Sequence, residues 1–243
     1  MAAAGANVVL GDIRVEAAEE AAAQISPEPG RECLSMQLDV ANPESVRAMA
    51  KATLERFGKI DILVNNAALN PKFDTKHAAD HSNSFEKFPF NEWEHAMAVN
   101  VTGMFLCAQA VAPAMVTAGS GVIVNISSTY GLVGPDQRLY ARDREPQQFK
   151  PVTYSVAKSA ALGLTRYLAT YYAGKGIRVN TLTPGGVFAD HDDEFVERYS
   201  AKTVLGRMAE KEEISSALLF LVSDASSYMT GANLVVDGGW TAW

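Results

Sequence analysis

A tyrosine and a lysine four positions apart are the residues of this sequence best suited to proton transfer. Tyr154 and Lys158 stand in the run YSVAK, inside a segment with a helical apolar pattern. On a helix they share one face, and an ammonium group beside a phenol favours the phenolate. A tyrosine with its ordinary pKa of about 10 needs such a neighbour to act as a general base near neutral pH. The alternative is a purely structural pair, because this spacing is common on helices.

Polar or turn-forming residues also stand where apolar, strand-like runs end. These residues are Asp12, Asp39, Asn65, Ser128 and Pro184. In a parallel α/β sheet, ligands bind at the carboxyl ends of the strands, so we expect these residues to line one crevice. Asp12 ends the first run, where a carboxylate can accept hydrogen bonds from an adenosine ribose and disfavour a 2′-phosphate. The alternative is that Asp12 caps the helix that follows.

Strands and helices alternate along the whole chain and must position these residues. We expect strands at 6–12, 33–40, 61–67, 121–128, 177–186 and 233–239, helices at 15–25, 43–58, from 91 onward, 153–172 and 212–223, and polar loops at 68–89, 135–151 and after 186. Apolar strands separated by helices indicate a parallel sheet covered on both faces. For 243 residues this predicts one α/β domain, 1–243, with a doubly wound parallel sheet.

Composition excludes several classes of function. The net charge of −7, with no basic cluster, disfavours nucleic acid as a partner. The chain does not begin with the basic and then apolar segments of a signal peptide. No apolar run has the roughly 18 residues of a membrane-spanning helix, so we expect no membrane association. Cys33 and Cys107 lie far apart in apolar contexts, which favours buried free thiols and a cytoplasmic protein.

Several motifs, in order, resemble those of the short-chain dehydrogenase/reductase family. They are NNAA after the third strand, the asparagine of AVNVTG, NISS, YSVAK, RVNTLTPGG and the terminal MTGANLVVDGG. Each motif is modest alone, but their joint order is specific and covers almost the entire chain. The resemblance implies a Rossmann-like fold and an NAD(P)-dependent oxidoreductase that interconverts an alcohol and a ketone.

The resemblance also implies catalytic roles. Tyr154 would exchange a proton with the substrate oxygen, and Lys158 would lower the pKa of Tyr154 and hold the nicotinamide ribose. Ser128 would hydrogen-bond the carbonyl or alkoxide, with Ser127 as the alternative if the alignment is shifted by one. Asn100 would bind a water that links Lys158 to solvent.

For the cofactor, the resemblance implies NAD rather than NADP, on the strength of Asp12. Asp39 and Val40 would meet the adenine, Asn65 and Ala67 would line the crevice, and Val187 would contact the carboxamide through its backbone. The implied contacts are Asp12, Asp39, Val40, Asn65, Ala67, Tyr154, Lys158, Pro184, Gly185 and Val187.

The sequence departs from the family pattern in three places. NNAA replaces the common NNAG, and Ala189 stands where a threonine often follows PGG. The family's first strand and glycine-rich TGxxxGxG turn, which hold the pyrophosphate at a helix N-terminus, do not precede MAAAGANVVLGDI. We therefore expect a chain that lacks about 20 to 30 N-terminal residues, part of one βαβ unit, with the missing strand lying between those that end at Asp12 and Asn65.

Two other functions compete with that of an oxidoreductase. A non-catalytic scaffold that resembles the short-chain dehydrogenase/reductases and binds a partner would explain the missing glycine-rich turn. Such a scaffold has no need of Asn100, Ser128, Tyr154 and Lys158 together. A methyltransferase on a similar sheet gives no reason for YSVAK after NISS.

Long polar segments indicate the substrate class. Residues 70–90, the stretch between Ser128 and Tyr154, and residues 187–200 would lie over the crevice and are rich in His, Lys, Arg and Asp. They favour a polyhydroxylated or anionic small molecule, with sugar-type alcohols as the specific expectation. The alternative is solvated loops that do not touch substrate.

Metal binding is not expected. His77 and His81 are four apart, but in a loop that spacing imposes no ligand geometry. By the family resemblance we expect a homodimer or homotetramer, assembled through the apolar faces of the long helices and the terminal GGWTAW.

Overall fold

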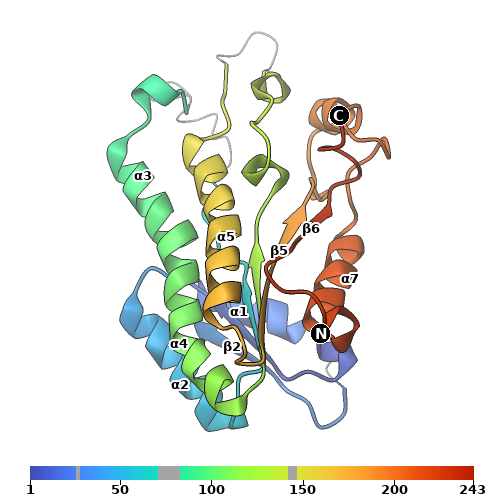
Figure 1. Cartoon of the computed structure of the whole chain (residues 1–243). Helices are drawn as coiled ribbons and strands as arrows, with labels where there is room; N and C mark the ends of the chain where they lie inside the picture. Colours follow the sequence, from blue (N-terminus) through green and yellow to red (C-terminus); the bar gives the residue numbers. More distant parts are fainter. Residues whose placement is uncertain (26–27, 71–82, 142–146) are drawn as a thin grey trace.

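The structure is a computed structural model that describes residues 1–25, 28–70, 83–141 and 147–243. Its strands are β1 (Val8–Asp12), β2 (Cys33–Gln37), β3 (Ile62–Asn65), β4 (Gly121–Ile126), β5 (Ile177–Pro184) and β6 (Asn233–Val236). Its α-helices are α1 (Val15–Ala23), α2 (Pro43–Phe57), α3 (Phe90–Met97), α4 (Gly103–Ala118), α5 (Val152–Tyr171), α6 (Asp193–Ser200) and α7 (Lys211–Val222). Short helical turns are η1 (Ala2–Ala4), η2 (Phe85–Lys87), η4 (Thr129–Gly131), η5 (Gln137–Tyr140) and η6 (Asp224–Ser226). The predicted alternation of strands and helices is confirmed (Figure 1).

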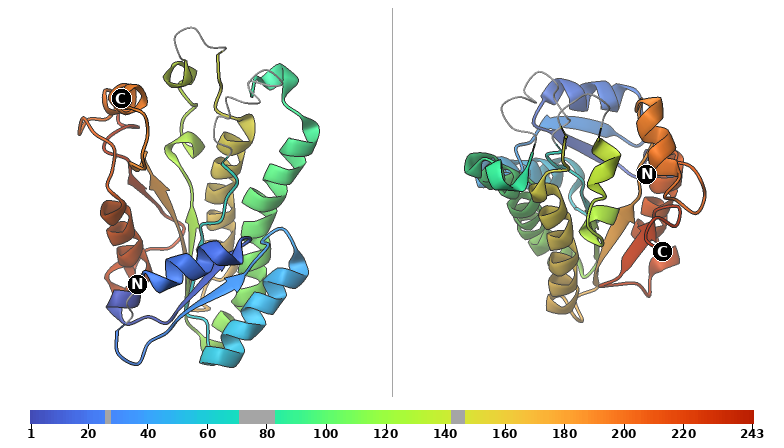
Figure 2. Two further views of the ribbon diagram at one scale, coloured as in Figure 1. Left: turned by 180° about the vertical axis from the view of Figure 1, so that it is seen from behind. Right: turned by 90° about the horizontal axis from the view of Figure 1, so that it is seen from above.

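All strand pairs are parallel, as predicted, but the sheet is in two parts. One part has the order β3-β4-β5-β6 and the other is the pair β1-β2. The two parts lie side by side, with β1-β2 and α1 behind the larger sheet in Figure 1 and in front of it in the left view of Figure 2. Among the described strands, β1 pairs only with β2 and β3 only with β4. The division lies where the family resemblance expects one more strand.

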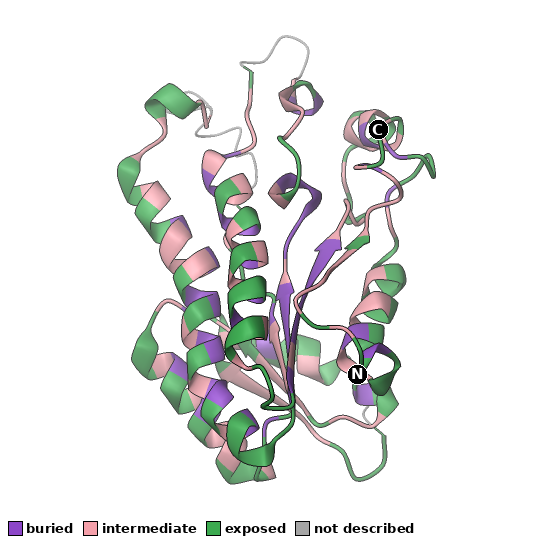
Figure 3. Cartoon of the chain, viewed as in Figure 1, coloured by how far each residue is buried: buried purple, intermediate pink, exposed green. Residues whose placement is uncertain are grey.

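Helices cover both faces of the larger sheet because its strands alternate between two apolar cores. Ile123 and Val179 face a core shared with α4 and α5, whereas the next residue of β4, Val124, faces α7 together with Leu182. All four side chains are fully buried, and Figure 3 shows this buried layer between the helices. Side chains of a strand point alternately to opposite faces, so a strand buried on both faces is apolar throughout.

Local signals for helix ends agree with the structure. Asn42 caps α2 by accepting hydrogen bonds from the backbone N–H groups of Glu44 and Ser45, and Pro43 follows at the first helical position. Gly58 ends this helix in the left-handed conformation, with φ 73°. Gly5 closes η1 in the same way, with φ 81°.

The prediction of a polar loop after residue 186 is wrong for part of that segment. Residues 193–200 form α6, whose N-cap Asp192 accepts a hydrogen bond from the backbone N–H of Phe195. Tyr199 is buried in an aromatic cluster and stacks on Trp240 at 4.3 Å between ring centroids. The helix forms because these long-range contacts cover the aromatic residues of an otherwise charged segment, which local polarity does not reveal.

One continuous helical run, Phe90–Ala118, has the length and apolar composition of a membrane-spanning helix. It comprises α3, a π-helical turn η3 (Ala98–Thr102) and α4. Its apolar residues include Ala108, Val111 and Met115, which are buried in the core beside the sheet. Packing in the core therefore accounts for part of its apolar composition.

Candidate active site

Tyr154 and Lys158 lie one turn apart near the start of α5, as predicted. The Lys158 ammonium lies 5.8 Å from the centroid of the Tyr154 ring. It donates a hydrogen bond of 2.9 Å to the carbonyl oxygen of Ile126, at the carboxyl end of β4. The lysine is buried, with 8% of its surface exposed. This bond therefore fixes the ammonium group at the edge of the sheet where the crevice was expected.

The two serines of NISS have different surroundings. The Ser128 hydroxyl accepts a hydrogen bond from the backbone N–H of Tyr130 at 3.2 Å, and it lies close enough to Tyr154 to lower the pKa of that phenol. The Ser127 hydroxyl instead donates to the carbonyl oxygen of Lys158 at 2.7 Å. The geometry thus brings Ser128, rather than Ser127, to the phenol of Tyr154. Ser127 ties the end of β4 to α5.

Gly131 permits the close approach of η4 to α5. A Cβ atom at this position would lie 2.6 Å from the Ser127 hydroxyl and 2.7 Å from the backbone carbonyl of Lys158. No larger residue fits there without separating the two elements. The Ser159 hydroxyl donates to the carbonyl oxygen of Gly131 at 3.0 Å and closes the contact. The glycine thereby sets how near Ser128 lies to Tyr154.

Burial shifts the pKa values of the two central groups in opposite senses. It lowers the pKa of Lys158 to about 8, because the ammonium is taken out of water. It raises the pKa of Tyr154, and the hydrogen bond to Ser128 acts in the opposite direction. The lowering of the Tyr154 pKa by Lys158 stays a prediction, because burial and the Ser128 side chain are the causes of this shift.

Asn100 lies in the π-helical turn and is 4% exposed. Its side chain accepts a 2.6 Å hydrogen bond from the backbone N–H of Leu69 and donates a 2.9 Å bond to the carbonyl of the same residue. Asn100 therefore anchors the segment that follows β3. A π-turn inside a helix commonly marks a functional position. The predicted water relay to Lys158 stays a prediction.

The residues expected to bind adenosine lie on the smaller sheet. Asp12 ends β1, and its carboxylate accepts a 2.9 Å hydrogen bond from the backbone N–H of Arg14, which is the N-cap of α1. Asp12 is thus not itself the cap of that helix. Asp39 accepts a 2.9 Å bond from the N–H of Ala41, and Val40 is buried against Gly103. Asp12 and Asp39 follow adjacent parallel strands, so they lie at the same edge.

Asn65 and Ala67 differ in their surroundings. Asn65 is buried and donates a 2.8 Å hydrogen bond to the side chain of Asn125 in β4. Asn125 in turn donates to Thr165 of α5 at 2.8 Å. The contacts of Asn65 therefore hold the sheet and α5 together. Ala67 is exposed beyond the end of β3, at the predicted crevice.

The PGG segment begins where β5 ends. Pro184 is its last residue, and the backbone N–H of Gly185 donates to the carbonyl of Val236 at 2.9 Å. A Cβ at Gly185 would lie 2.8 Å from the Cα of Asp237, so the chain passes close to β6 here. Val187 makes an isolated parallel bridge with Ala209. With these contacts, the PGG segment lies along the carboxyl edge of the larger sheet, near Ser128.

Sequence analysis missed Lys150 and an aromatic wall. The Lys150 ammonium lies 4.0 Å from the centroid of the Tyr154 ring. Tyr140 and Tyr199 belong to a buried cluster that also contacts Tyr154. The signal for Lys150 was present, because it precedes Tyr154 by four residues just as Lys158 follows it by four. It stood in a segment interpreted as a charged loop.

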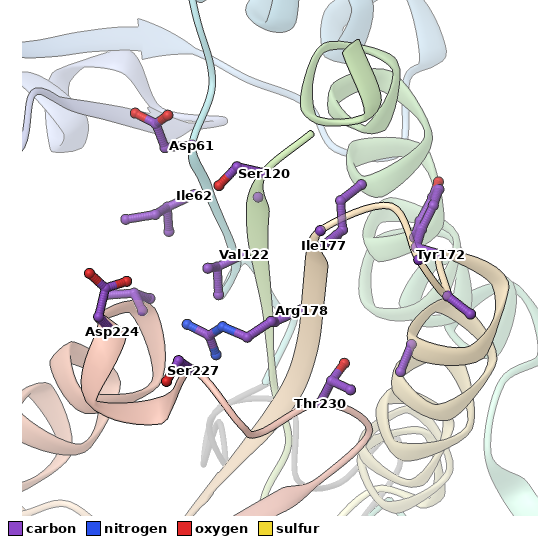
Figure 4. Close-up of a pocket in the computed structure, with 16 residues that line it drawn as sticks. Asp61, Ile62, Ser120, Val122, Tyr172, Ile177, Arg178, Asp224, Ser227 and Thr230 are labelled. Atoms are coloured by element: carbon purple, nitrogen blue, oxygen red, sulfur yellow. The ribbon is translucent and has the colours of Figure 1, made fainter. Parts of the chain in front are cut away.

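A separate cavity of about 440 Å³ opens at the opposite, amino end of the strands. Figure 4 shows that Ile62, Val122 and Arg178 line it from three neighbouring strands. The Arg178 guanidinium donates to the carbonyl oxygens of Leu221 and Ser223 at 3.1 Å, at the end of α7. The Arg178 guanidinium therefore satisfies carbonyl groups at the end of α7. None of the predicted site residues lies in this cavity.

The described residues contain no cluster of three or more side chains suited to a metal ion. His77 and His81 lie outside the described residues.

A parallel, Rossmann-like sheet with a tyrosine, a lysine and a serine gathered at its carboxyl edge defines the class as an oxidoreductase of this fold. The family model described as Enoyl-(Acyl carrier protein) reductase matches residues 1–241. The trans-4-hydroxycyclohexanecarboxylate dehydrogenase of Sinomonas cyclohexanicum is 39% identical over 100% of this chain and 86% of its own. The galactitol 2-dehydrogenase (L-tagatose-forming) of Cereibacter sphaeroides is 36% identical over 100% and 88%.

Solved structures similar to this chain include members of the same family. A short-chain type dehydrogenase/reductase from Mycobacterium marinum has a TM-score of 0.83 and 33% identity over 100% of this chain and 87% of its own. A gluconate 5-dehydrogenase from Burkholderia cenocepacia J2315, in complex with NADP and tartrate, has a TM-score of 0.80 and 30% identity over 100% and 88%. The chain belongs to the short-chain dehydrogenase/reductase family and is an enzyme. Its relatives are named as dehydrogenases of alcohols, which disfavours the non-catalytic scaffold.

Proposed function

We propose that this protein is an NAD-dependent dehydrogenase that interconverts a polar, sugar-like secondary alcohol and its ketone, with Tyr154 as the general acid and base. The observation that carries the proposal is the position of the Tyr154 side chain, beside Ser128, which lowers its pKa, and 5.8 Å from the Lys158 ammonium. A phenol, a hydroxyl and an ammonium group meet at the carboxyl edge of the sheet, where ligands of such folds bind.

The residues at this edge fit a nicotinamide dinucleotide. Among the described residues, the Lys158 ammonium has one recorded hydrogen bond, to Ile126, which leaves donors for ribose hydroxyls. Asp12 supplies a carboxylate at the end of β1, where it suits an adenosine ribose and disfavours a 2′-phosphate. Asp39 and Val40 would meet the adenine, while Asn65, Ala67, Pro184, Gly185 and Val187 would line the crevice. When bound, the cofactor supplies or accepts the hydride at the carbinol carbon.

The chain's own groups perform the proton chemistry. In the direction of reduction, Tyr154 donates its phenolic proton to the oxygen that gains negative charge, and the Ser128 hydroxyl hydrogen-bonds the same oxygen. Burial keeps Tyr154 protonated at neutral pH, which suits this direction. In oxidation the phenolate takes the proton, and Lys158 stabilises that negative charge. Asn100 positions Leu69 at the rim of the site.

The test is the variant Tyr154→Phe, assayed by absorbance of the reduced nicotinamide with galactitol and trans-4-hydroxycyclohexanecarboxylate as probe alcohols. We expect kcat to fall by about 100-fold or more, because proton transfer of this kind contributes about 10²- to 10⁴-fold. Tyr167→Phe is the matched control, since Tyr167 stands on the same helix but is 61% exposed. Unchanged turnover in a folded Tyr154→Phe protein would contradict the mechanism.

We also propose a cytoplasmic homodimer or homotetramer. Large apolar side chains are exposed on the long helices, including Phe105 and Val116 of α4 and Tyr167 and Tyr171 of α5. Figure 3 shows exposed residues along both of these helices. Exposed apolar residues gathered on long helices support an interface between subunits. Both cysteines are free, which suits a reducing compartment.

A further inference from the structure

A second lysine lies against the catalytic tyrosine. The Lys150 ammonium stands over the face of the Tyr154 ring, 4.0 Å from its centroid, whereas the Lys158 ammonium is 5.8 Å from the same point. Lys150 is half-buried and directly precedes Pro151, the N-cap of α5. Tyr154 therefore has a cation on each side along the chain, one turn before it and one turn after it.

The structure holds Lys150 at three points. Its backbone N–H donates to the side-chain oxygen of Gln137 at 2.8 Å, and its carbonyl accepts from the amide nitrogen of the same glutamine at 3.4 Å. Its ammonium donates to the side-chain oxygen of Asn70 at 2.7 Å. Asn70 follows Leu69, which Asn100 anchors. A lysine fixed in this way has lost the freedom of a surface side chain, so its placement is specific.

No negative charge among the described residues balances this lysine. None of the ion pairs between described residues includes Lys150 or Lys158. Burial and the nearby Lys158 charge lower the pKa of Lys150 to about 8, so it remains mainly protonated at neutral pH. Two cations that have no ion-pair partner among the described residues stabilise an anion that enters between them.

We propose that Lys150, positioned by Asn70 and Gln137, binds a carboxylate of the substrate, and that the enzyme therefore acts on hydroxy acids. The inference rests on the proposed function, since Tyr154 must bind the reacting oxygen. Lys150 lies over the ring whose hydroxyl contacts that oxygen, so a small molecule can reach both groups only if a few carbon atoms separate its hydroxyl from its carboxylate. The ammonium donates charge-assisted hydrogen bonds to the carboxylate.

The relatives differ in whether the substrate for which they are named carries a carboxylate. One is named for a hydroxy acid, 4-hydroxycyclohexanecarboxylate, and another for galactitol, a neutral polyol. The placement of Lys150 favours the first type for this chain. Sugar acids combine both features and remain within the proposed polar, sugar-like class.

The first measurement compares two matched alcohols, trans-4-hydroxycyclohexanecarboxylate and its carboxamide, which differ in charge and hardly in shape. We expect the ratio of their kcat/KM values to favour the acid in the wild type and to fall about tenfold or more in Lys150→Met, because hydrogen bonds to charged groups contribute on that scale. Lys150→Arg should retain most of the ratio. Lys175→Met is the control for net charge, since Lys175 is exposed just before β5, at the amino end of the strands.

The second measurement needs no turnover. Calorimetric titration with cyclohexanecarboxylate and cyclohexanecarboxamide should show about tenfold tighter binding of the acid in the wild type and in Lys175→Met. This preference should be lost in Lys150→Met and in Asn70→Asp, which places a competing carboxylate beside the ammonium.

The outcomes separate this inference from the proposed function. If the wild type has no preference for the acid, or if Lys150→Met keeps it, the carboxylate site is wrong even when Tyr154→Phe abolishes turnover. An equal loss of kcat/KM on both alcohols also overturns it and assigns Lys150 to the tyrosine itself. If the acid preference depends on Lys150 but Tyr154→Phe keeps full turnover, the anion site stands and the proposed mechanism fails.

Discussion

Adding one methyl group at Gly131 tests whether the contact between η4 and α5 positions Ser128, the serine proposed to hydrogen-bond the substrate oxygen. In Gly131→Ala the new Cβ would lie 2.6 Å from the Ser127 hydroxyl and 2.7 Å from the Lys158 carbonyl, well inside ordinary van der Waals contact. The obstructing atoms include helix backbone, which cannot rotate away. The turn that begins after Ser128 must therefore move off α5 by several tenths of an ångström, and Ser128 moves away from Tyr154 with it.

The structure sets the size of the expected effect. Overpacking of this kind costs about 1–3 kcal/mol, and in a domain of this size each kcal/mol lowers the melting temperature by about 2–4 °C. Misplacement of a catalytic group by about 1 Å can lower the rate by about 100-fold. We therefore expect both a lower melting temperature and a kcat reduced by about 10- to 100-fold.

The assay pairs thermal unfolding, followed by circular dichroism, with steady-state kinetics on the best probe alcohol. Gly134→Ala is the matched control, because Gly134 lies in the same loop and a Cβ there has nothing within 4 Å. This control should keep the wild-type melting temperature and rate. If Gly131→Ala retains the wild-type kcat, the close approach of η4 to α5 does not position Ser128 and the reasoning is refuted.

Three further predictions follow from burial, charge and exposure. Because burial lowers the pKa of Lys158 to about 8, the folded protein releases this proton at a lower pH than the unfolded chain does. The contribution of Lys158 to the free energy of unfolding therefore rises between about pH 8 and 10.5. The free energy of unfolding of Lys158→Met minus that of the wild type should accordingly fall over this range, and a flat difference would contradict the buried cation. Asp12→Ala should weaken NAD binding about tenfold and weaken NADP binding less, as measured by fluorescence titration; equal losses would remove Asp12 from the ribose site. Light scattering at micromolar concentration should show a dimer or tetramer, and the double variant Tyr167→Glu, Tyr171→Glu should dissociate it; a monodisperse wild-type monomer would refute the helix interface.

The sequence by itself determined the elements and the identity of the chemical groups. Apolar runs such as those of β4 and β5 mark strands buried on both faces, because their apolar residues pack in one or the other of two cores. The caps of α2 are equally local, since Asn42, Pro43 and Gly58 act through their own side chains and backbone angles. The four-residue spacing of Tyr154 and Lys158 needs only the geometry of a helix. Such features depend on neighbours in the chain and can be predicted.

Only the tertiary structure decided how these groups meet. The different contacts of Ser127 and Ser128, the anchoring of Leu69 by Asn100 and the formation of α6 depend on contacts between distant segments. The pKa of Tyr154 also depends on such contacts, because burial among several elements raises it. Lys150 is the clearest case, since its position depends on Gln137 and on Asn70, which is eighty positions away. Periodicity carries no information on such distances, because side chains far apart in sequence approach one another only once the core has formed.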